Sequence, residues 1–189
     1  MPEPAAGRLA GRVALITGGS RGQGAAHAQR LAAEGASVLL ADVLDADGLL
    51  TEKQLLTAGF DAAYLHLDVS DPTSWQTAYE LIDARFGRLD ILVNNAGIIH
   101  VTPIEDESVV EWNRLLSVNL TGAFLGLHTM IPLLRRGTNP AVVKTSSIFG
   151  PSGAIGYAAS KAGLLGLTRT RRWSLPATGS GSTRLCRAA

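Results

Sequence analysis

The sequence predicts an α/β fold in which helices cover both faces of a doubly wound sheet of parallel strands. Short apolar runs alternate five times with segments of helical spacing, which is the pattern of such sheets. The apolar runs at residues 38–41 and 91–93 do not alternate with polar residues, as expected for strands buried on both faces. A chain of 189 residues suits one domain with a sizeable core.

Each expected strand is a β-rich apolar run that ends in glycine, aspartate, asparagine or serine. The strands are expected at residues 12–19, 37–42, 62–68, 88–97 and 141–147. Parallel strands joined by helices place their carboxyl ends at one edge of the sheet, and ligands bind beyond that edge. The loops that follow the five strands are therefore expected to converge on one cleft.

The segments between the strands have the apolar spacing of helices. They are expected at residues 22–35, 44–58, 72–86 and 109–136, and from residue 157 onward. Gly35 is a stop signal for the first helix, and Ser70 and Asp71 ahead of Pro72 form a cap for the third. The fourth, long helix is expected to be interrupted near Gly122.

The composition argues against a nucleic-acid or membrane partner. Lys plus Arg is 17 and Asp plus Glu is 16, and the two signs are interspersed, so no basic field is available. Charged residues are 17% of the chain, below the roughly 25% of an average soluble domain. Helices or a partner are expected to cover much of the surface, and we expect a neutral or amphipathic ligand and a homo-oligomer.

Cysteine and histidine usage gives no sign of a disulfide or a metal. Cys186 is the only cysteine, and the four histidines have no metal-ligand spacing. No segment reaches 18 consecutive apolar residues, and the N-terminus does not resemble a signal peptide. A cytoplasmic location is expected.

The stretch "TGGSRGQG" at residues 17–24 lies between the first strand and the first helix. Glycines there permit a tight turn and let a pyrophosphate approach backbone N–H groups at the helix N-terminus. Asp42 ends the second strand, 18 residues after Gly24, where an acidic side chain would meet the adenosine ribose hydroxyls. The combination predicts a bound dinucleotide.

Four features together resemble the short-chain dehydrogenase/reductase family. They are the spacing of the glycine loop, "NNAG" at residues 94–97, Ser147, and "YAASK" at residues 157–161. The resemblance runs from about residue 8 to residue 170 and implies a Rossmann fold. The stretches "LLADVLDADG" and "LHLDVSDPTSWQ" further resemble the bacterial 3α (or 20β) hydroxysteroid dehydrogenases within that family.

The resemblance implies a hydride transfer between NAD(H) and a secondary alcohol or ketone, with a hydroxysteroid among the candidate substrates. It implies that Tyr157 is the general acid/base, Lys161 binds the nicotinamide ribose, Ser147 hydrogen-bonds the substrate oxygen and Asn119 supports a proton path. A phenol titrates near about pH 10, so acid/base work near neutral pH needs a nearby cation. Lys161, one helical turn after Tyr157, would supply that charge.

The resemblance also implies which residues bind the cofactor. They are Gly18, Ser20, Arg21, Gly22, Gln23, Gly24, Asp42, Asp68, Val69, Asn94, Ala96, Gly97, Tyr157 and Lys161. Asp42 would repel the 2′-phosphate of NADP, so NAD is the expected cofactor. Two alternatives remain open: a non-catalytic nucleotide-binding remnant, and a 3-oxoacyl carrier reductase that uses NADPH. One departure from the family is that Ser147 lies ten residues before Tyr157, a few fewer than usual.

The sequence after Thr170 does not follow the family. Relatives continue the last helix with an Ala-Glu-Leu type segment and a strand ending in Asn-x-Val-x-Pro-Gly, whereas residues 171–189 are rich in Arg, Ser, Thr and Gly. Residues 1–170 are thus expected to form the nucleotide-binding domain, without the family's C-terminal strands, and residues 171–189 a disordered tail. A GC-rich back-translation of this tail, shifted by one base, reads "AAVELARYGQRVNAVVPG". A one-base frameshift is therefore the expected origin of the tail.

Overall fold

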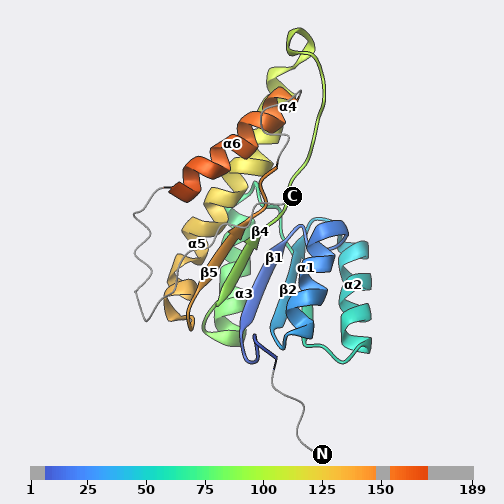
Figure 1. Ribbon diagram of the computed structural model, residues 1–189, viewed down its shortest axis with the longest axis vertical. Helices are drawn as coiled ribbons and strands as arrows, with labels where there is room; N and C mark the ends of the chain where they lie inside the picture. Colours follow the sequence, from blue (N-terminus) through green and yellow to red (C-terminus); the bar gives the residue numbers. More distant parts are fainter. Residues whose placement is uncertain (1–6, 148–153, 170–189) are drawn as a thin grey trace, which may run out of the picture.

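The centre of the fold is a sheet of five parallel strands. The computed structural model describes residues 7–147 and 154–169. The strands are β1 (Val13–Thr17), β2 (Ser37–Asp42), β3 (Ala62–His66), β4 (Ile91–Asn94) and β5 (Ala141–Lys144). They lie in the order β3-β2-β1-β4-β5, and each neighbouring pair is parallel (Figure 1). The predicted doubly wound sheet is confirmed.

Helices cover both faces of the sheet. They are α1 (Gly22–Ala33), α2 (Asp45–Thr57), α3 (Pro72–Phe86), α4 (Val109–Leu116), α5 (Gly122–Arg136) and α6 (Ile155–Arg169), with a short 3-10 turn η1 (Ile104–Asp106). The buried residues of α1 and α2 pack on one face, and those of α3 and α5 pack on the other. α6 packs against α4, and both extend above the carboxyl edge of the sheet in Figure 1.

The boundaries of two helices follow the signals in the sequence. The Asp71 carboxylate accepts hydrogen bonds from Thr73 N at 2.9 Å and Ser74 N at 3.2 Å, so it caps α3 as predicted. Pro72 is the first residue of that helix, where its missing N–H costs nothing. Gly35, just beyond α1, has φ +94°, a conformation that few other residues adopt.

Each central strand contributes to two separate cores. In β1, Leu15 belongs to the core under α3 and α5, whereas Ile16 belongs to the core under α1 and α2. Successive side chains of a strand point to opposite faces, so a strand covered on both sides must be apolar throughout. This explains why the strand runs lack alternation.

Gly126 allows α5 to pack closely on α3. A Cβ at Gly126 would lie 2.5 Å from the ring of Trp75, which is fully buried and donates from Nε1 to Val69 O at 2.9 Å. We expect Gly126→Ala to lower the free energy of unfolding by about 1 kcal/mol, because an overpacking cost of about 1–3 kcal/mol exceeds the gain in helix propensity of about 1. Urea denaturation measures the change. Gly166→Ala in α6, where a Cβ meets nothing within 4 Å, is the control and should not be destabilised.

The segment between β4 and β5 forms one long helix with a widened turn. The π-helical turn Ser117–Thr121 joins α4 to α5, and the flanking residues Leu116 and Gly122 keep helical backbone angles. The interruption predicted near Gly122 is therefore a π turn and not a break. Among the described residues, this stretch, Val109–Arg136, is the one long and apolar enough to cross a membrane by length and composition. That is weak evidence for a span, because core helices pass the same test, and α5 buries seven of its residues.

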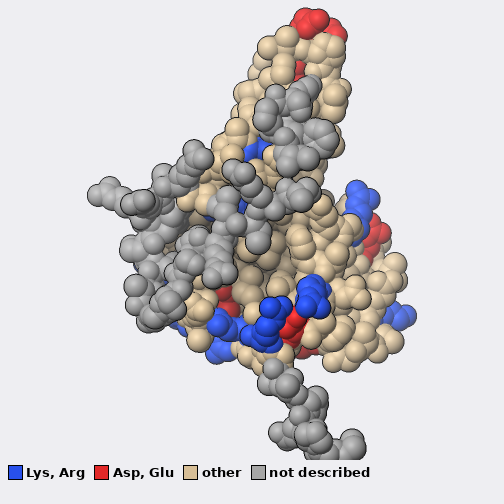
Figure 2. All heavy atoms as spheres, viewed as in Figure 1, with Lys and Arg blue, Asp and Glu red and all other residues tan. Residues whose placement is uncertain are grey.

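The strand order reverses at β1, which lies between β2 and β4. The loops after β1 and β4 therefore lead to opposite sides and leave room at the carboxyl edge, where sheets of this kind bind ligands. On the face shown in Figure 2, Lys and Arg are interspersed with Asp and Glu around the lower part of the molecule. That face carries no broad field of one sign.

Candidate active site

The loop between β1 and α1 lies against the loop that follows β4. A Cβ at Gly18 would lie 2.9 Å from Ala96 Cα, and a Cβ at Gly24 would overlap the carbonyl oxygen of Gly18. Asn95 Nδ2 donates to Thr17 O at 3.1 Å and Gly18 O at 3.2 Å, which ties the two loops together. Both glycines are thus required by close approach of backbone to backbone.

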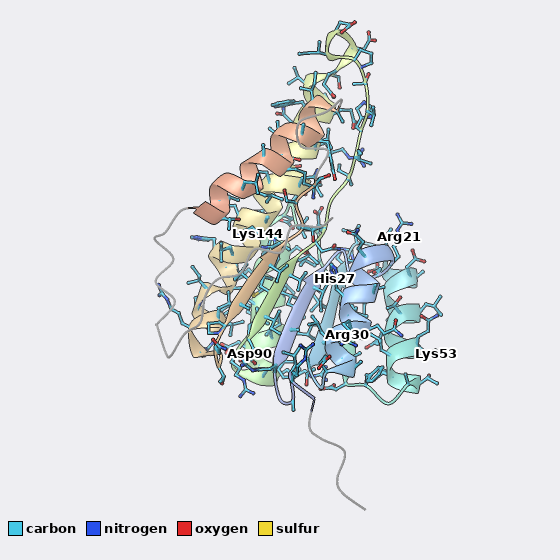
Figure 3. The ribbon with its side chains drawn as sticks, viewed as in Figure 1. Arg21, His27, Arg30, Lys53, Asp90 and Lys144 are labelled. Carbon is cyan, nitrogen blue, oxygen red and sulfur yellow. The ribbon has the colours of Figure 1, made fainter. Side chains whose placement is uncertain are left out.

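The N-terminus of α1 meets the carboxyl edge of the sheet. No side chain caps this end, so it presents backbone N–H groups and the positive end of the helix dipole to an anion. Arg21, at the start of α1, lies at the same edge (Figure 3). The arrangement suits a phosphate or pyrophosphate.

Asp42 ends β2 beside the glycine loop. Its Oδ2 accepts a hydrogen bond from Ser20 N at 3.1 Å, and its Oδ1 accepts from Val43 N at 2.8 Å and Leu44 N at 3.3 Å. These bonds hold the carboxylate between the glycine loop and the start of α2.

A cavity of about 720 Å³ opens between these elements. Nine residues of the predicted cofactor set line it: Gly18, Arg21, Gln23, Gly24, Asp42, Asp68, Val69, Ala96 and Gly97. Eight residues that the sequence did not single out also line it: Val43, Leu44, Ser70, Asn95, Ile98, Arg114, Ser117 and Val118. Four of these eight directly adjoin residues of the predicted cofactor set, Leu44 lies two residues after Asp42, and the other three come from the long helix.

Five residues of the predicted cofactor set do not line the cavity: Tyr157 and Lys161, described below, and Ser20, Gly22 and Asn94. Ser20 is buried, and its Oγ donates to Leu44 O at 3.3 Å. Gly22 begins α1 with φ +57°. Asn94 is buried within the sheet, and its Nδ2 donates to Ala123 O of α5 at 3.3 Å. A direct role of these three in cofactor binding stays a prediction.

Gly97 connects the cavity to the predicted catalytic residues. It lines the cavity, and a Cβ at this position would lie 3.3 Å from both Lys161 Nζ and Asn119 Oδ1. Lys161 Nζ donates to Thr145 O at 2.9 Å, in the loop after β5. The carboxyl ends of β4 and β5, α6 and the π turn therefore meet at one point.

Asn119 lies in the π turn with its amide fully engaged. Its Oδ1 accepts from Ile98 N at 2.8 Å, and its Nδ2 donates to Ile98 O at 2.8 Å and Ser160 Oγ at 3.1 Å. Single π turns within α-helices occur frequently at functional sites. The three bonds fix Asn119 next to Lys161.

Tyr157 and Lys161 lie one turn apart on α6. Lys161 Nζ is 5.5 Å from the centroid of the Tyr157 ring, within the range of a cation–π contact. Lys161 is 4% exposed, and burial lowers its pKa to about 8. A cation thus lies beside the phenol, as the predicted acid/base pair requires.

The pKa of Lys161 predicts how stability depends on pH. An exposed lysine titrates near about 10.4, so between about pH 8 and 10.4 the unfolded chain binds more protons than the folded chain, and stability rises with pH. The cost of the buried charge is fully present below about pH 8 and is lost above about pH 10.4. We expect Lys161→Met to reduce this rise by up to about 3 kcal/mol, while Lys144, whose pKa burial also lowers, keeps its own contribution. Urea denaturation across this window measures the change, with exposed Lys53→Met as the control. A rise of undiminished size in Lys161→Met would contradict the prediction.

Ser147 lies three residues after the end of β5 and is half-buried. Of the short loop predicted between Ser147 and Tyr157, residues 148–153 lie outside the described residues, and α6 already begins at Ile155. The predicted tail at residues 171–189 also lies outside them. The contact of Ser147 with the substrate oxygen stays a prediction.

Two of the four histidines make ordinary contacts. His66 Nδ1 lies 2.7 Å from Asp45 Oδ1 at the surface, and His128 stacks on Phe124 with ring centroids 5.7 Å apart. Within residues 7–147 and 154–169, no group of three or more His, Cys, Asp or Glu side chains could hold a metal ion.

Comparison with known proteins decides the family. The family model described as short chain dehydrogenase matches residues 12–179. The chain belongs to the short-chain dehydrogenase family. The match extends past residue 170, where the domain was predicted to end, so that boundary stays a prediction.

Curated short-chain dehydrogenases match most of the chain. It is 42% identical to 3-alpha-(or 20-beta)-hydroxysteroid dehydrogenase of Mycobacterium tuberculosis, over 92% of this chain and 66% of that enzyme. It is 44% identical to trans-4-hydroxycyclohexanecarboxylate dehydrogenase of Sinomonas cyclohexanicum, over 89% of this chain and 68% of that enzyme. The chain therefore spans slightly less than two thirds of the mycobacterial relative's length.

Solved structures of short-chain dehydrogenases share the fold. A dehydrogenase/reductase from Sinorhizobium meliloti is 36% identical with a TM-score of 0.80, covering 85% of this chain and 65% of that one. A short chain dehydrogenase from Mycobacterium smegmatis is 32% identical with a TM-score of 0.81, covering 86% and 70%. The Rossmann-type sheet expected from the sequence is thus that of the family.

Proposed function

We propose that the chain carries the site of an NAD-dependent oxidoreductase that interconverts a secondary alcohol and a ketone. The observation that carries the proposal is Gly97, which lines the cavity and lies against both Lys161 and Asn119. A dinucleotide held at one end by the glycine loop and Asp42 would have its reactive end beside these residues. Bound nicotinamide supplies or accepts the hydride.

The chain's own residues would then handle the proton. In reduction, the Tyr157 hydroxyl donates its proton to the carbonyl oxygen, and in oxidation the phenolate takes the proton from the alcohol. Lys161, 5.5 Å from the Tyr157 ring centroid, stabilises negative charge on the phenol oxygen. Ser147 would hydrogen-bond the substrate oxygen, and Asn119 would support the path that returns the proton to solvent.

The names of the relatives point to an alcohol carried on a ring. Besides the hydroxysteroid and hydroxycyclohexanecarboxylate dehydrogenases, a 40% identical relative from Comamonas testosteroni is named cyclopentanol dehydrogenase. We propose alicyclic secondary alcohols, hydroxysteroids among them, as the substrate class. A panel of such alcohols with NAD tests this proposal. Oxidation of open-chain alcohols only would count against it.

Asp42 supports NAD over NADP. A 2′-phosphate about 4 Å from the carboxylate would be repelled by about 1 kcal/mol in water and about 4 at an effective dielectric of 20. We expect Asp42→Ala to narrow the preference for NADH over NADPH by about tenfold, because both the repulsion and the ribose hydrogen bond are lost. Fluorescence titration of both cofactors measures it, with exposed Asp47→Ala as the control. Tighter binding of NADPH by the unaltered chain would overturn the assignment.

Cofactor binding without turnover would favour the alternative of a nucleotide-binding remnant. The fluorescence titrations of NADH and NADPH also test the alternative of a 3-oxoacyl carrier reductase, because that activity would use NADPH. Asp42, which would select NAD, favours the NAD-dependent alcohol oxidoreductase over the NADPH-dependent carrier reductase. The presence of both Tyr157 and Lys161 favours the oxidoreductase over a non-catalytic remnant.

A homo-oligomer remains a proposal. Five apolar side chains on the segment from β4 into α4 are more than 60% exposed: Ile99, Val101, Ile104, Val109 and Val110. Such a concentration of exposed apolar residues is typical of a surface that contacts a partner.

A further inference from the structure

The turn between β2 and α2 contains Asp42 and is bonded from two sides. On the side of the glycine loop, Thr51 Oγ1 donates to Ser20 O at 2.7 Å, and Ser20 Oγ donates to Leu44 O at 3.3 Å. On the other side lies β3, at the edge of the sheet, whose Tyr64 reaches over to the turn. The contact between Tyr64 and the turn has no part in the cofactor binding or the proton transfer proposed above.

Tyr64 bonds to both ends of this turn. Its hydroxyl lies 2.6 Å from the main-chain oxygen of Asp42 and 2.7 Å from Asp45 Oδ1, so the two acceptors share its single proton. Burial, and then the Asp45 carboxylate, raise the pKa of Tyr64, so the hydroxyl remains a donor over the working range of pH. The hydroxyl is therefore protonated and able to donate to the turn under ordinary conditions.

The ring of Tyr64 is held in place by α2. A Cβ at Gly48 would overlap the ring carbons, so only glycine lets α2 approach this closely. Glu52 Oε1 accepts from Tyr64 N at 3.1 Å, which ties the backbone of Tyr64 to the same helix. The hydroxyl thus has a fixed position from which to act on the turn.

The contact acts on the peptide unit that joins Asp42 to Val43. The oxygen of this unit accepts from Leu67 N at 2.9 Å as well as from the Tyr64 hydroxyl. The N–H of the same unit donates to Asp42 Oδ1 at 2.8 Å. A bond that fixes the plane of this peptide therefore also fixes the carboxylate.

We infer that Tyr64 is a positioning residue for the cofactor, which holds the Asp42–Val43 peptide and through it the carboxylate that discriminates NAD from NADP. This inference rests on the proposed role of Asp42 in selecting NAD. Tyr64 is not among the residues that line the cavity, so it acts through Asp42. When the hydroxyl is absent, Leu67 N is the remaining donor to this peptide oxygen among the described residues, so the peptide and the carboxylate are held less tightly. The ribose is then bound more weakly, and a 2′-phosphate meets less repulsion.

The test is Tyr64→Phe, which removes the hydroxyl and keeps the ring against Gly48. We expect its NADH dissociation constant to rise about three- to tenfold, as for one lost hydrogen bond, with a smaller change for NADPH. The ratio of the NADPH dissociation constant to the NADH dissociation constant therefore falls. In the Asp42→Ala background the same substitution should change NADH binding less than about twofold, because the carboxylate it positions is gone.

Two further variants keep the test decisive. Tyr79→Phe on α3 removes a tyrosine hydroxyl away from the turn and should leave both dissociation constants unchanged. Gly48→Ala displaces the Tyr64 ring and should narrow the preference in the same way as Tyr64→Phe. Thermal melting of each variant reports any general loss of stability.

The outcomes separate this inference from the proposed function. An equal change for both cofactors, or an undiminished effect in the Asp42→Ala background, would show a merely structural role and overturn the inference. If Tyr64→Phe changes neither the NADH nor the NADPH dissociation constant, the inference is also overturned. The proposed function stands in that case as long as the unaltered chain binds NADH more tightly than NADPH. Failure of the unaltered chain to prefer NADH would overturn both.

Discussion

A chain read with one base restored after the Thr170 codon is expected to oxidise alcohols far faster than the chain as it stands. With the GC-rich codons of the back-translation, the restored frame would replace the present tail with "AAVELARYGQRVNAVVPG", the type of segment with which the family continues. Two or three additional contacts to the substrate, each worth about 1 kcal/mol, correspond to a gain of about 30- to 100-fold in kcat/KM. The measurement is NADH formation by both purified chains at equal concentration.

The restored chain is also expected to be more soluble and to melt at a higher temperature. Among the described residues, β5 is paired with β4 and forms one edge of the sheet. An exposed strand edge is a template for aggregation, and a further strand beside β5 would remove it. Equal activity and equal melting of the two chains would contradict the frameshift. A chain that carries the same inserted base together with a compensating deletion three codons later is the control for expression.

Tyr157→Phe is expected to lower kcat by about 100- to 10,000-fold, the usual contribution of a positioned acid/base group. NADH binding should change little, because the ring beside Lys161 is retained and only the hydroxyl is lost. Turnover is measured in the restored frame, and NADH binding is measured in both chains.

The control for Tyr157→Phe is Tyr79→Phe, whose hydroxyl lies on α3, far along the chain from α6. It should keep full activity. Retained turnover in Tyr157→Phe would assign the proton transfer to another group, and a matching loss of NADH affinity would indicate that the phenol serves binding instead.

Most of the sheet could be predicted because each strand carries its signal locally. The run "SVLLAD" matches β2 residue for residue, since both faces of this strand are covered and the four positions between Ser37 and Asp42 are apolar. Pro72 with Asp71 fixed the start of α3 for the same local reason. The other strands end earlier than their apolar runs, because pairing with a neighbour, and not composition, decides where a strand ends.

The site was predicted less completely because part of it depends on distant contacts. The π turn around Asn119 has no distinct local pattern, and Asn119 is held by Ile98 and Ser160, which lie 21 and 41 residues away in the chain. Arg114 and Val118 reach the cavity only because the long helix crosses the carboxyl edge. Asn95 could have been found from the motif "NNAG", in which it directly follows the buried Asn94 at the end of β4.

The π turn also determines how the long helix would tolerate a change in length. A π turn fits about one residue more than an α-helical turn into one full turn, so deletion of one residue from it would restore regular α-helical geometry and leave the two flanking segments in nearly the same orientation. Met130 and Leu134, which hold α5 in the core with no exposed surface, would keep their places, and α4 would still form its part of the cavity wall. The widened turn that places Asn119 against Ile98 would be lost. A homologous helix that is one residue shorter here would therefore need a different support for its proton path, although its core packing would be unchanged.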